Sequence, residues 1–442
     1  MNGFLAGTAI VDISPGKGID LAGYPHFPRY NTGIHDPLYA SCLYLKNSHT
    51  HVAIVTLDIL FFSKRHVAAV RQKIQEREGI PAANIMISCS HTHSGPWASG
   101  RLDSESLLAG LRENGPYVEG LVEKIVGIVA EAKNNAFPAE IGFGKEYCGR
   151  EMGIGGNRRD PNGPCDPYVY VLAVRDAAGI VKSVLVNYAL HPTLIHEEST
   201  VVTADYPGYV RETLEGKYPE AVMLFAQGTS GNQSTRYFRQ GQSFSEAERI
   251  GRTMGACVIK SIETFNFTAD PTIGVISEEI PVRIRQLPAR ETLERRVRED
   301  RARYDKAIKD GAPYLDIQNA NLKLLGSEDL LGYVIMRESG KKIDLLEDEQ
   351  PAEIQVITIG AMKLIGIPGE VFVEFGLEIK RQVGGHVDGA LVVINELANG
   401  CLPGYVCTEG AYAEGGYEAD TSLLDFSYGR DIVQKAVELA KR

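Results

Sequence analysis

The first part of the chain alternates between strand-like and helix-like patterns of apolar residues. Residues 38–47 and 51–58 read as two strands around a short Asn-Ser turn. Residues 63–78 carry apolar side chains at helical spacing, and the short apolar run 84–89 predicts a buried strand. Because a helix separates the last two strands, we expect them to pair in parallel.

The remainder of the chain continues the alternation of strands and helices. The further predicted elements are a helix over much of 104–135 with a break at Gly115–Pro116, strands 168–174 and 181–190, a helix after Tyr206–Pro207, strand 221–226, helix 244–265, a hairpin around Gly360–Ala361, helix 369–383, strand 389–394 and helix 429–441. No linker rich in Pro, Gly or Ser divides the chain. We therefore predict one α/β domain over residues 1–442, with a mixed sheet and flanking helices.

One segment differs from this pattern. Residues 287–345 are charged and prone to form helix, as in ARETLERRVREDRARYDKAIKDG. We interpret this segment as a helical insertion that runs over the surface, with its basic stretch as a solvated face. A local partner site on that stretch is the alternative.

Composition narrows the class of protein. The 442 residues include 46 Lys plus Arg against 57 Asp plus Glu, a formal net charge of −11, so no general basic surface for nucleic acid is expected. Seven Cys without a CxxC pair suggest neither a disulfide scaffold nor a thiolate zinc cluster. No signal peptide and no run of 18 apolar residues is visible, so we expect a cytoplasmic protein without a transmembrane helix. The oligomeric state cannot be read from the sequence.

Three histidines directly follow predicted strands. His91 and His93 come after the strand 84–89, and His191 comes after the strand 181–190, where Pro192 restricts its backbone. Imidazole is a common zinc ligand, and loops at the carboxyl ends of strands collect ligand sites. By residue type alone, a metal site and ordinary hydrogen-bonded histidines both remain open. We interpret the nearby His196 as a surface loop residue.

Other candidate residues stand at similar places. Glu370 lies between a predicted strand and a helix, where a metal ligand and a helix-capping residue are both reasonable. Tyr405 and Tyr417 lie in a glycine-rich stretch, and Ser234 ends the small polar loop after strand 221–226, which is otherwise a plain turn. Asp58 and Asp205 are candidates either to orient imidazoles or to cap local structure.

These pieces occur together in an order that is much more specific than any one of them. The motifs are GTAIVDISP, LAGYP, GIHDPLYA, HTHSGP, NRR, NYALHPT, DYPGY, GNQS, IPGE and GYVCTEGAYAEGGYEADTS. With them, the chain resembles the catalytic domain of the neutral/alkaline non-lysosomal ceramidase family. The resemblance covers most of the chain apart from 287–345, and does not include the C-terminal sandwich domain of that family.

The resemblance implies roles for particular residues. In the family, one zinc ion is held by two His, a Glu and a Tyr, which match His91, His191, Glu370 and Tyr405. The family's substrate-side residues match His93, Tyr417 and Arg158, and its catalytic serine matches Ser234. In this chain Asn232 and Thr235 replace the acidic residue and the proline of that serine loop.

The predicted function is a zinc-dependent hydrolase that cleaves an amide (N-acyl) bond by metal-activated water. Its expected partner is a small-molecule or lipid-like N-acyl substrate. Because no signal peptide and no sandwich domain are visible, we do not expect ceramide itself to be the physiological substrate. Two alternatives remain open. One is a zinc-dependent esterase or lactonase acting on a small non-lipid substrate, and the other is a catalytically silent binding homologue.

Overall fold

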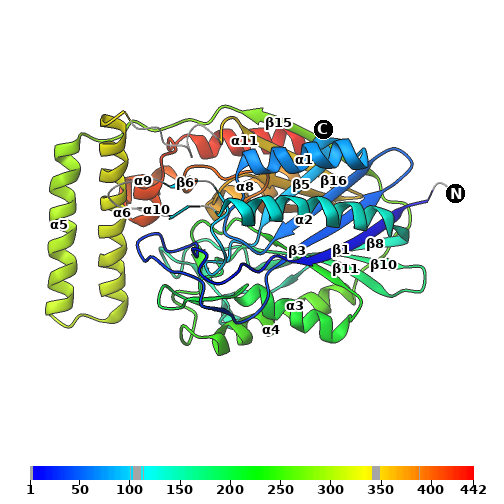
Figure 1. Ribbon diagram of the computed structural model, residues 1–442, viewed down its shortest axis with the longest axis horizontal. Coiled ribbons are helices and arrows are strands. Elements are labelled where there is room, and N and C mark those ends of the chain that lie inside the picture. The colour runs from blue at the N-terminus through cyan, green and yellow to red at the C-terminus, as the bar shows by residue number, and fades with distance from the viewer. Residues whose placement is uncertain (1–2, 100, 103–110, 113, 341–348, 388) are drawn as a thin grey trace.

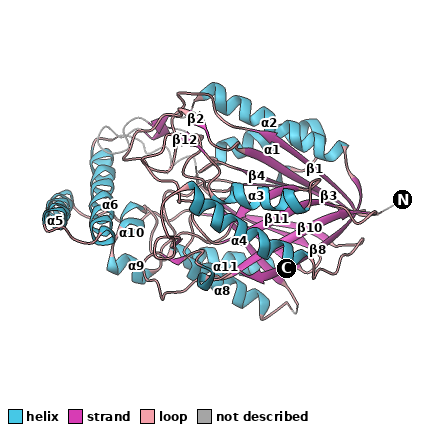
Figure 2. Ribbon diagram, turned by 90° about the horizontal axis from the view of Figure 1, so that it is seen from below, coloured by secondary structure: helices cyan, strands magenta, loops and turns pink. Residues whose placement is uncertain are grey.

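Two β-sheets stacked face to face form the centre of the protein (Figures 1 and 2). The computed structural model describes residues 3–99, 101–102, 111–112, 114–340, 349–387 and 389–442. The larger sheet has the strand order β13-β11-β10-β8-β1-β3-β4-β5. Its strands are β1 (Leu5–Asp12), β3 (Tyr39–Lys46), β4 (His51–Leu57), β5 (Ile85–Cys89), β8 (Phe137–Tyr147), β10 (Tyr168–Asp176), β11 (Val181–Tyr188) and β13 (Val222–Gln227).

The smaller sheet follows later in the chain. It consists of β15 (Ile273–Ile280), β16 (Ala352–Ile359), β17 (Met362–Ile367) and β18 (Leu391–Glu396), in that order. Apolar side chains from both sheets, including Leu43, Leu185, Ile357 and Val393, pack in one buried cluster. The alternating side chains of each strand thus cover a core shared by the two sheets.

Helices cover the outer faces of both sheets. The larger sheet is covered by α1 (Lys64–Glu78), α2 (Gly115–Asn134), α3 (Tyr206–Lys217) and α4 (Phe244–Ile262). The smaller sheet is covered by α8 (Val373–Gly384) and α11 (Tyr428–Ala440). The molecule is therefore a layered α/β structure, which confirms the predicted fold class.

A helical hairpin stands at one end of this core (Figure 1). It is formed by α5 (Arg290–Lys309) and α6 (Tyr314–Glu338) and lies within the segment predicted to be helical. The outer helix, α5, buries few side chains, whereas α6 packs on the short helix α10 (Tyr417–Thr421). Another short helix, α9 (Glu409–Glu414), precedes α10.

Most predicted elements are present, with two kinds of difference. β4 and β5 are parallel as expected, and β16 and β17 form the expected hairpin. The helix predicted over 104–135 begins only at Gly115, because Asn114 caps it by accepting a hydrogen bond from the main-chain N–H of Tyr117. Residues 104–110 and 113 of that prediction lie outside the described residues. The sequence did not predict β1, β8 or β15.

Small elements join the loops near the carboxyl ends of the strands. Paired short strands are β2 (Gly33–Ile34) with β12 (Val201–Val202), β9 (Gly156–Asn157) with β14 (Gln233–Ser234), and β6 (Arg101–Leu102) with β7 (Leu111–Arg112). Among the described residues, no helix has the length and apolar character needed to cross a membrane.

Candidate metal centre and active site

The ends of three strands bring a carboxylate and two imidazoles together. His91 follows β5, His191 follows β11, and Glu370 follows β17 of the other sheet. One oxygen of Glu370, Oε2, lies 3.0 Å from Nε2 of His191 and 3.2 Å from Nε2 of His91. His93 lies beside them, with its Nε2 3.4 Å from Nε2 of His91. The three imidazoles offer ligand nitrogens that lie within 4.8 Å of one another.

Main-chain carbonyl groups orient the two imidazoles that face Glu370. Nδ1 of His191 lies 2.7 Å from the carbonyl oxygen of Ser230, and Nδ1 of His91 lies 3.2 Å from that of Leu60. These contacts leave Nε2 of each ring directed at the carboxylate. His91 also has a positive φ of 68°, an uncommon backbone conformation for histidine that turns its side chain into the site.

The predicted role of Asp58 and Asp205 in orienting imidazoles is wrong. The carboxylate of Asp58 pairs with Arg211, with a distance of 2.6 Å, and also accepts the main-chain N–H of Tyr39. Asp205 caps α3, which was the alternative interpretation, and among the described residues the hydrogen bonds that it accepts come from main-chain N–H groups. Backbone carbonyls therefore do what carboxylates were expected to do.

Glu396 is a buried residue that the sequence analysis missed. It ends β18, and its carboxylate accepts hydrogen bonds from the main-chain N–H groups of Ser230 and Val371 and from the hydroxyl of Ser230. Ser230 in turn orients His191, and Val371 follows Glu370. Glu396 thus connects the loop that orients His191 with the loop that carries Glu370. It occupies a strand end like the other candidates, which is the signal that would have identified it.

The position of His93 depends on two further residues. Gly23 has a φ of 99°, and a Cβ atom there would lie 2.5 Å from Cβ of His93, so only glycine fits. The guanidinium of Arg29 donates a hydrogen bond of 2.6 Å to the carbonyl oxygen of His93. Nδ1 of His93 is buried without a hydrogen-bond partner among the described residues.

Burial and mutual charge set the protonation of this cluster. Burial, together with the neighbouring His91 and His191, lowers the pKa of His93 well below its ordinary value. Burial and the charge of Arg158 lower the pKa of His191 to about 4. For Glu370, burial alone would raise the pKa, but the adjacent imidazoles hold it well below its ordinary value. Neutral imidazoles beside an ionised carboxylate are the forms that bind a metal ion.

The predicted ligand Tyr405 lies next to this cluster. The main chain of Val406 pairs with Glu370, since its N–H donates a 2.9 Å hydrogen bond to the Glu370 carbonyl. The centroid of the Tyr405 ring lies 6.2 Å from the centroid of the His191 ring, and the same distance separates the ring centroids of Tyr405 and Tyr417. Burial raises the pKa of Tyr405 well above its ordinary value, and the charge of Glu370 adds to this effect.

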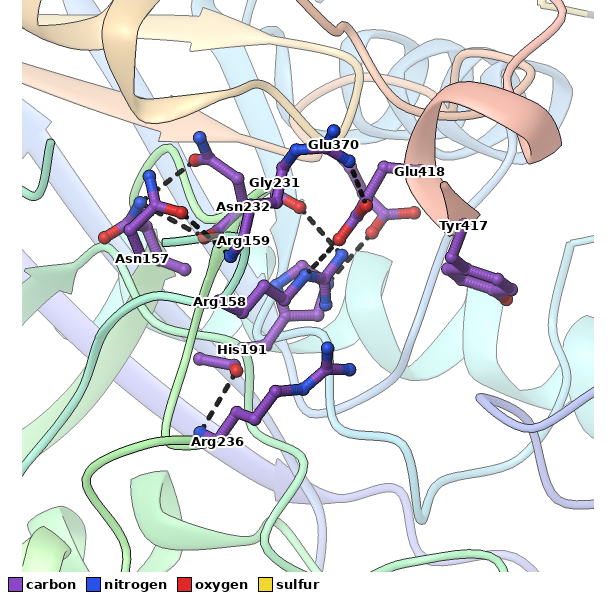
Figure 3. Close-up of polar contacts among 12 residues, drawn as sticks. Asn157, Arg158, Arg159, His191, Gly231, Asn232, Arg236, Glu370, Tyr417 and Glu418 are labelled. Carbon is purple, nitrogen blue, oxygen red and sulfur yellow. Dashed lines mark hydrogen bonds and ion pairs between the residues drawn. The ribbon is translucent and has the colours of Figure 1, made fainter. Parts of the chain in front are cut away.

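Arg158 lies in the middle of the site (Figure 3). Its guanidinium is 5.3 Å from the centre of the Tyr405 ring and forms a 2.7 Å ion pair with Glu418. It also donates to the carbonyl oxygen of Gly231. The second carboxylate oxygen of Glu418 pairs with Arg159 at 3.0 Å. Glu418, which the sequence analysis did not select although it adjoins Tyr417, therefore fixes both arginines.

The hydroxyl of Ser234 does not join the imidazole cluster, although the carbonyl groups of Ser230 and Gln233 in the same loop contact His191. The hydroxyl of Ser234 accepts a hydrogen bond from the main-chain N–H of Arg236, and no contact between it and a histidine is present among the described residues. Asn232, which stands where the family has an acidic residue, accepts the main-chain N–H of Val373 and donates to Glu374. In this chain the loop therefore holds the start of α8.

A cavity of about 580 Å³ opens above these residues. All the predicted site residues except His191 line it, and His191 is fully buried behind them. His196 is a partly exposed loop residue, as expected, and it also lines the cavity. Part of the wall comes from α6, including Leu322, Leu325 and Tyr333, although the sequence predicted only a surface-covering segment there.

Similarity to known proteins agrees with this site. Residues 4–150 match the family described as neutral/alkaline non-lysosomal ceramidase, N-terminal. The chain is 23% identical to the neutral ceramidase of Pseudomonas aeruginosa, over 96% of this chain and 70% of the relative. The crystal structure of neutral ceramidase from Pseudomonas aeruginosa aligns with 100% of this chain, with a TM-score of 0.76 and 19% identity. The alignment covers 74% of the ceramidase chain. A ceramidase complexed with C2 gives 18% identity and a TM-score of 0.73, with 75% of its length matched.

The resemblance inferred from the sequence motifs is thus confirmed: in sequence and in fold, this chain is similar to the neutral/alkaline non-lysosomal ceramidases.

Proposed function

We propose that this protein is a zinc-dependent hydrolase that cleaves the amide bond of an N-acyl substrate. The observation that carries the proposal is the convergence of His91 and His191 on one carboxylate oxygen of Glu370, beside a cavity wide enough for an organic substrate. The similarity to neutral ceramidase, an amide hydrolase by its name, supports the same reaction class.

The side chains present fit a zinc ion. Two or three imidazole nitrogens and a carboxylate oxygen are a donor set that zinc prefers, and burial favours the neutral imidazole of His93 and of His191 by lowering the pKa of each. His91, His191 and Glu370 would hold the ion, and Tyr405 would complete its ligands. When bound, zinc lowers the pKa of water from about 15.7 toward about 7 and polarises a carbonyl group.

Other residues would act on the substrate. His93 lines the cavity beside His91, so its imidazole would hold or transfer a proton at the scissile amide. Tyr417 borders the cavity on the side of Tyr405 and would orient the substrate. Arg158 holds the Tyr405 ring and the Gly231 loop in place, and its role toward substrate is through this positioning.

The test is to measure metal and activity together. We expect the purified protein to contain zinc by elemental analysis and to hydrolyse acyl p-nitroanilides of some chain length. His191→Ala should lose most of the metal and the activity together, because it removes one ligand and leaves the Glu370 carboxylate half-paired. His386→Ala, at an exposed histidine just after α8, is the matched control and should change neither.

Two results would contradict the proposal. One is full activity in protein stripped of metal, and the other is zinc-loaded protein that turns over no amide of any chain length. Amide and ester hydrolysis both pass through a tetrahedral intermediate, so the metal ligands do not distinguish them. Rates measured in parallel on p-nitrophenyl esters of the same acyl groups would separate an amidase from an esterase.

A further inference from the structure

Two arginines in the cavity have no acidic partner. Arg236 and Arg239 both line the cavity, directly after the Ser234 loop, and both are partly buried. Among the described residues, no carboxylate lies within 4.0 Å of either guanidinium. Arg236 donates one hydrogen bond, 3.3 Å long, to Oδ1 of Asn319 on α6, and Arg239 lies 3.4 Å from Nε2 of His196.

The other charged residues around the cavity are paired, apart from Lys323, whose side chain is exposed. Glu418 pairs with Arg158 and Arg159, Glu197 lies 2.7 Å from Nδ1 of His196, and Asp329 lies 3.3 Å from Nε2 of His26. Arg29, a buried arginine near the site, directs its donors to main-chain carbonyl groups. Among the arginines that line the cavity, Arg236 and Arg239 are therefore the two without a carboxylate within ion-pair distance in the described part of the chain.

Their donors remain reachable from the cavity. A guanidinium has five N–H donors in a rigid fork, and each of these arginines has one side-chain contact to another residue among those described. No side-chain nitrogen of Arg236 or Arg239 is both fully buried and without a hydrogen-bond partner, whereas Nε of Arg29 is. The unused donors thus face space in which a ligand can lie.

Burial makes this arrangement costly without a ligand. It lowers the pKa of both guanidiniums, and the charge of Arg158 lowers that of Arg236 further, while Glu418 opposes this effect from beyond ion-pair distance. For Arg239, Tyr24 and Glu197 oppose the effect of burial in the same way. A guanidinium nevertheless keeps its charge, so two partly desolvated cations remain in one cavity.

The rest of the cavity is suited to an apolar group. Leu60, Phe61 and Trp97 line one part of it, and Leu322 and Leu325 of α6 line another. A molecule that fills this cavity would therefore combine an apolar portion with a negatively charged one.

We propose that Arg236 and Arg239 bind an anionic group, a carboxylate or a phosphate, on the N-acyl substrate of this site. The inference rests on the proposed function and narrows its substrate class from neutral amides to anionic acyl amides. Arginine forks match both carboxylate and phosphate oxygens, so the geometry is the same for either group.

Binding can be measured without turnover, because Trp97 is the only tryptophan of the chain and it lines the cavity. Its fluorescence would be titrated with three pairs of compounds. The pairs are N-lauroylglycine and N-lauroylglycinamide, N-lauroyl-phosphoethanolamine and N-lauroylethanolamine, and dodecanedioic acid monoethanolamide and its methyl ester. They place a carboxylate on the amine part, a phosphate on the amine part, and a carboxylate on the acyl part.

We expect the anionic member of at least one pair to bind about tenfold to a hundredfold more tightly than its neutral partner. The pair that shows the preference identifies the charged group and the part of the substrate that carries it. The preference should also weaken as salt rises. Equal binding of both members in all three pairs would overturn the proposal.

Variants connect the preference to these residues. Arg236→Gln and Arg239→Gln should each reduce the anionic preference by about tenfold and leave binding of the neutral member within about threefold. Arg239→Lys should retain part of it, because the charge remains. Arg252→Gln, an exposed arginine on α4 paired with Glu248, is the control and should retain the full preference.

Failure of this inference differs from failure of the proposed function. If the variants weaken both members of a pair equally, the arginines have only a structural role and the inference is wrong. If the anionic compounds bind through Arg236 and Arg239 but no amide is cleaved, the binding site stands and the hydrolase proposal is wrong.

Discussion

Asp205 is a buried carboxyl group whose hydrogen bonds all come from the main chain. It accepts the N–H groups of Leu194, Ile195 and Tyr206, and its backbone has a positive φ of 60°. Burial raises its pKa from the ordinary 3.8 to about 6, although these three hydrogen bonds oppose the rise. The folded protein therefore favours the protonated carboxyl more than the unfolded chain does.

This shift predicts a pH dependence of stability. Because the folded pKa is raised, the contribution of Asp205 to the free energy of unfolding is full below about pH 4 and is lost as the pH rises through 6. The difference in unfolding free energy between the wild type and Asp205→Asn, which cannot titrate, should fall by about 2 kcal/mol from pH 4 to pH 7. Urea unfolding at several pH values measures it, and a constant difference would contradict the shift.

At the scale of single residues, the sequence predicted the cluster but not its supports. His91, His191 and Glu370 could be predicted because each directly follows an apolar strand, and strand ends meet in this fold. Glu396 and Arg236 could not be assigned in the same way. Their roles arise from contacts with residues 166 and 83 positions away, Ser230 and Asn319, which no local pattern encodes.

At the scale of elements, α6 and α10 meet at a glycine. Gly326 of α6 lies against α10, where an added Cβ would be 2.9 Å from Cβ of Asp420 and 3.3 Å from Cα of Tyr417. The side chain of Asp420 cannot easily move away, because it pairs with Arg296 of α5. The close approach of the two helices thus fixes the position of Tyr417.

We therefore expect Gly326→Ala to displace Tyr417. Overpacking should lower the unfolding free energy by about 1 kcal/mol, and the displacement should lower kcat/KM for the amide substrate by about tenfold. Gly127→Ala is a matched control at an exposed position of α2, where no atom lies within 4 Å of the added Cβ. It should raise stability by up to about 1 kcal/mol and leave kcat/KM unchanged. Equal behaviour of the two variants would show that the α6–α10 contact does not position Tyr417.

Predictability of the elements followed the clarity of their patterns. The buried strands β4, β5 and β11 were predicted because they are rich in apolar and β-branched residues. In contrast, β8 contains Pro138, Gly142 and Gly144, and β15 is largely half-buried with two consecutive glutamates, so neither has a clear strand signal. The contact of α6 with the cavity could not be predicted, because its sequence shows helix but not what the helix packs against.

At the scale of the whole molecule, the candidate metal ligands come from both sheets. His91 and His191 belong to the larger sheet, whereas Glu370 follows a strand of the smaller one. Zinc bound at this site should therefore stabilise the packing of the two sheets as well as the site. At a free zinc concentration one hundred times the dissociation constant, the gain would be about 2.7 kcal/mol.

Removal of metal should accordingly lower the melting temperature, and added zinc should restore it. Scanning calorimetry of the chelated and reloaded protein measures both steps. His191→Ala should melt at the same temperature with and without zinc. This control shows whether the stabilisation by zinc comes from binding at this site or from zinc bound elsewhere on the protein. An unchanged melting temperature of the wild-type protein on chelation would contradict a resident metal ion.

The shared carboxylate oxygen of Glu370 also has a consequence for biosynthesis. Glu370 lies 179 residues after His191 in the chain, and Tyr405 comes later still. Domains emerge from the ribosome with the N-terminal part first, at about 5–20 residues per second. His191 is therefore made roughly ten to forty seconds before the carboxylate that pairs with it, and a nascent chain cannot hold the complete site until Tyr405 has been synthesised.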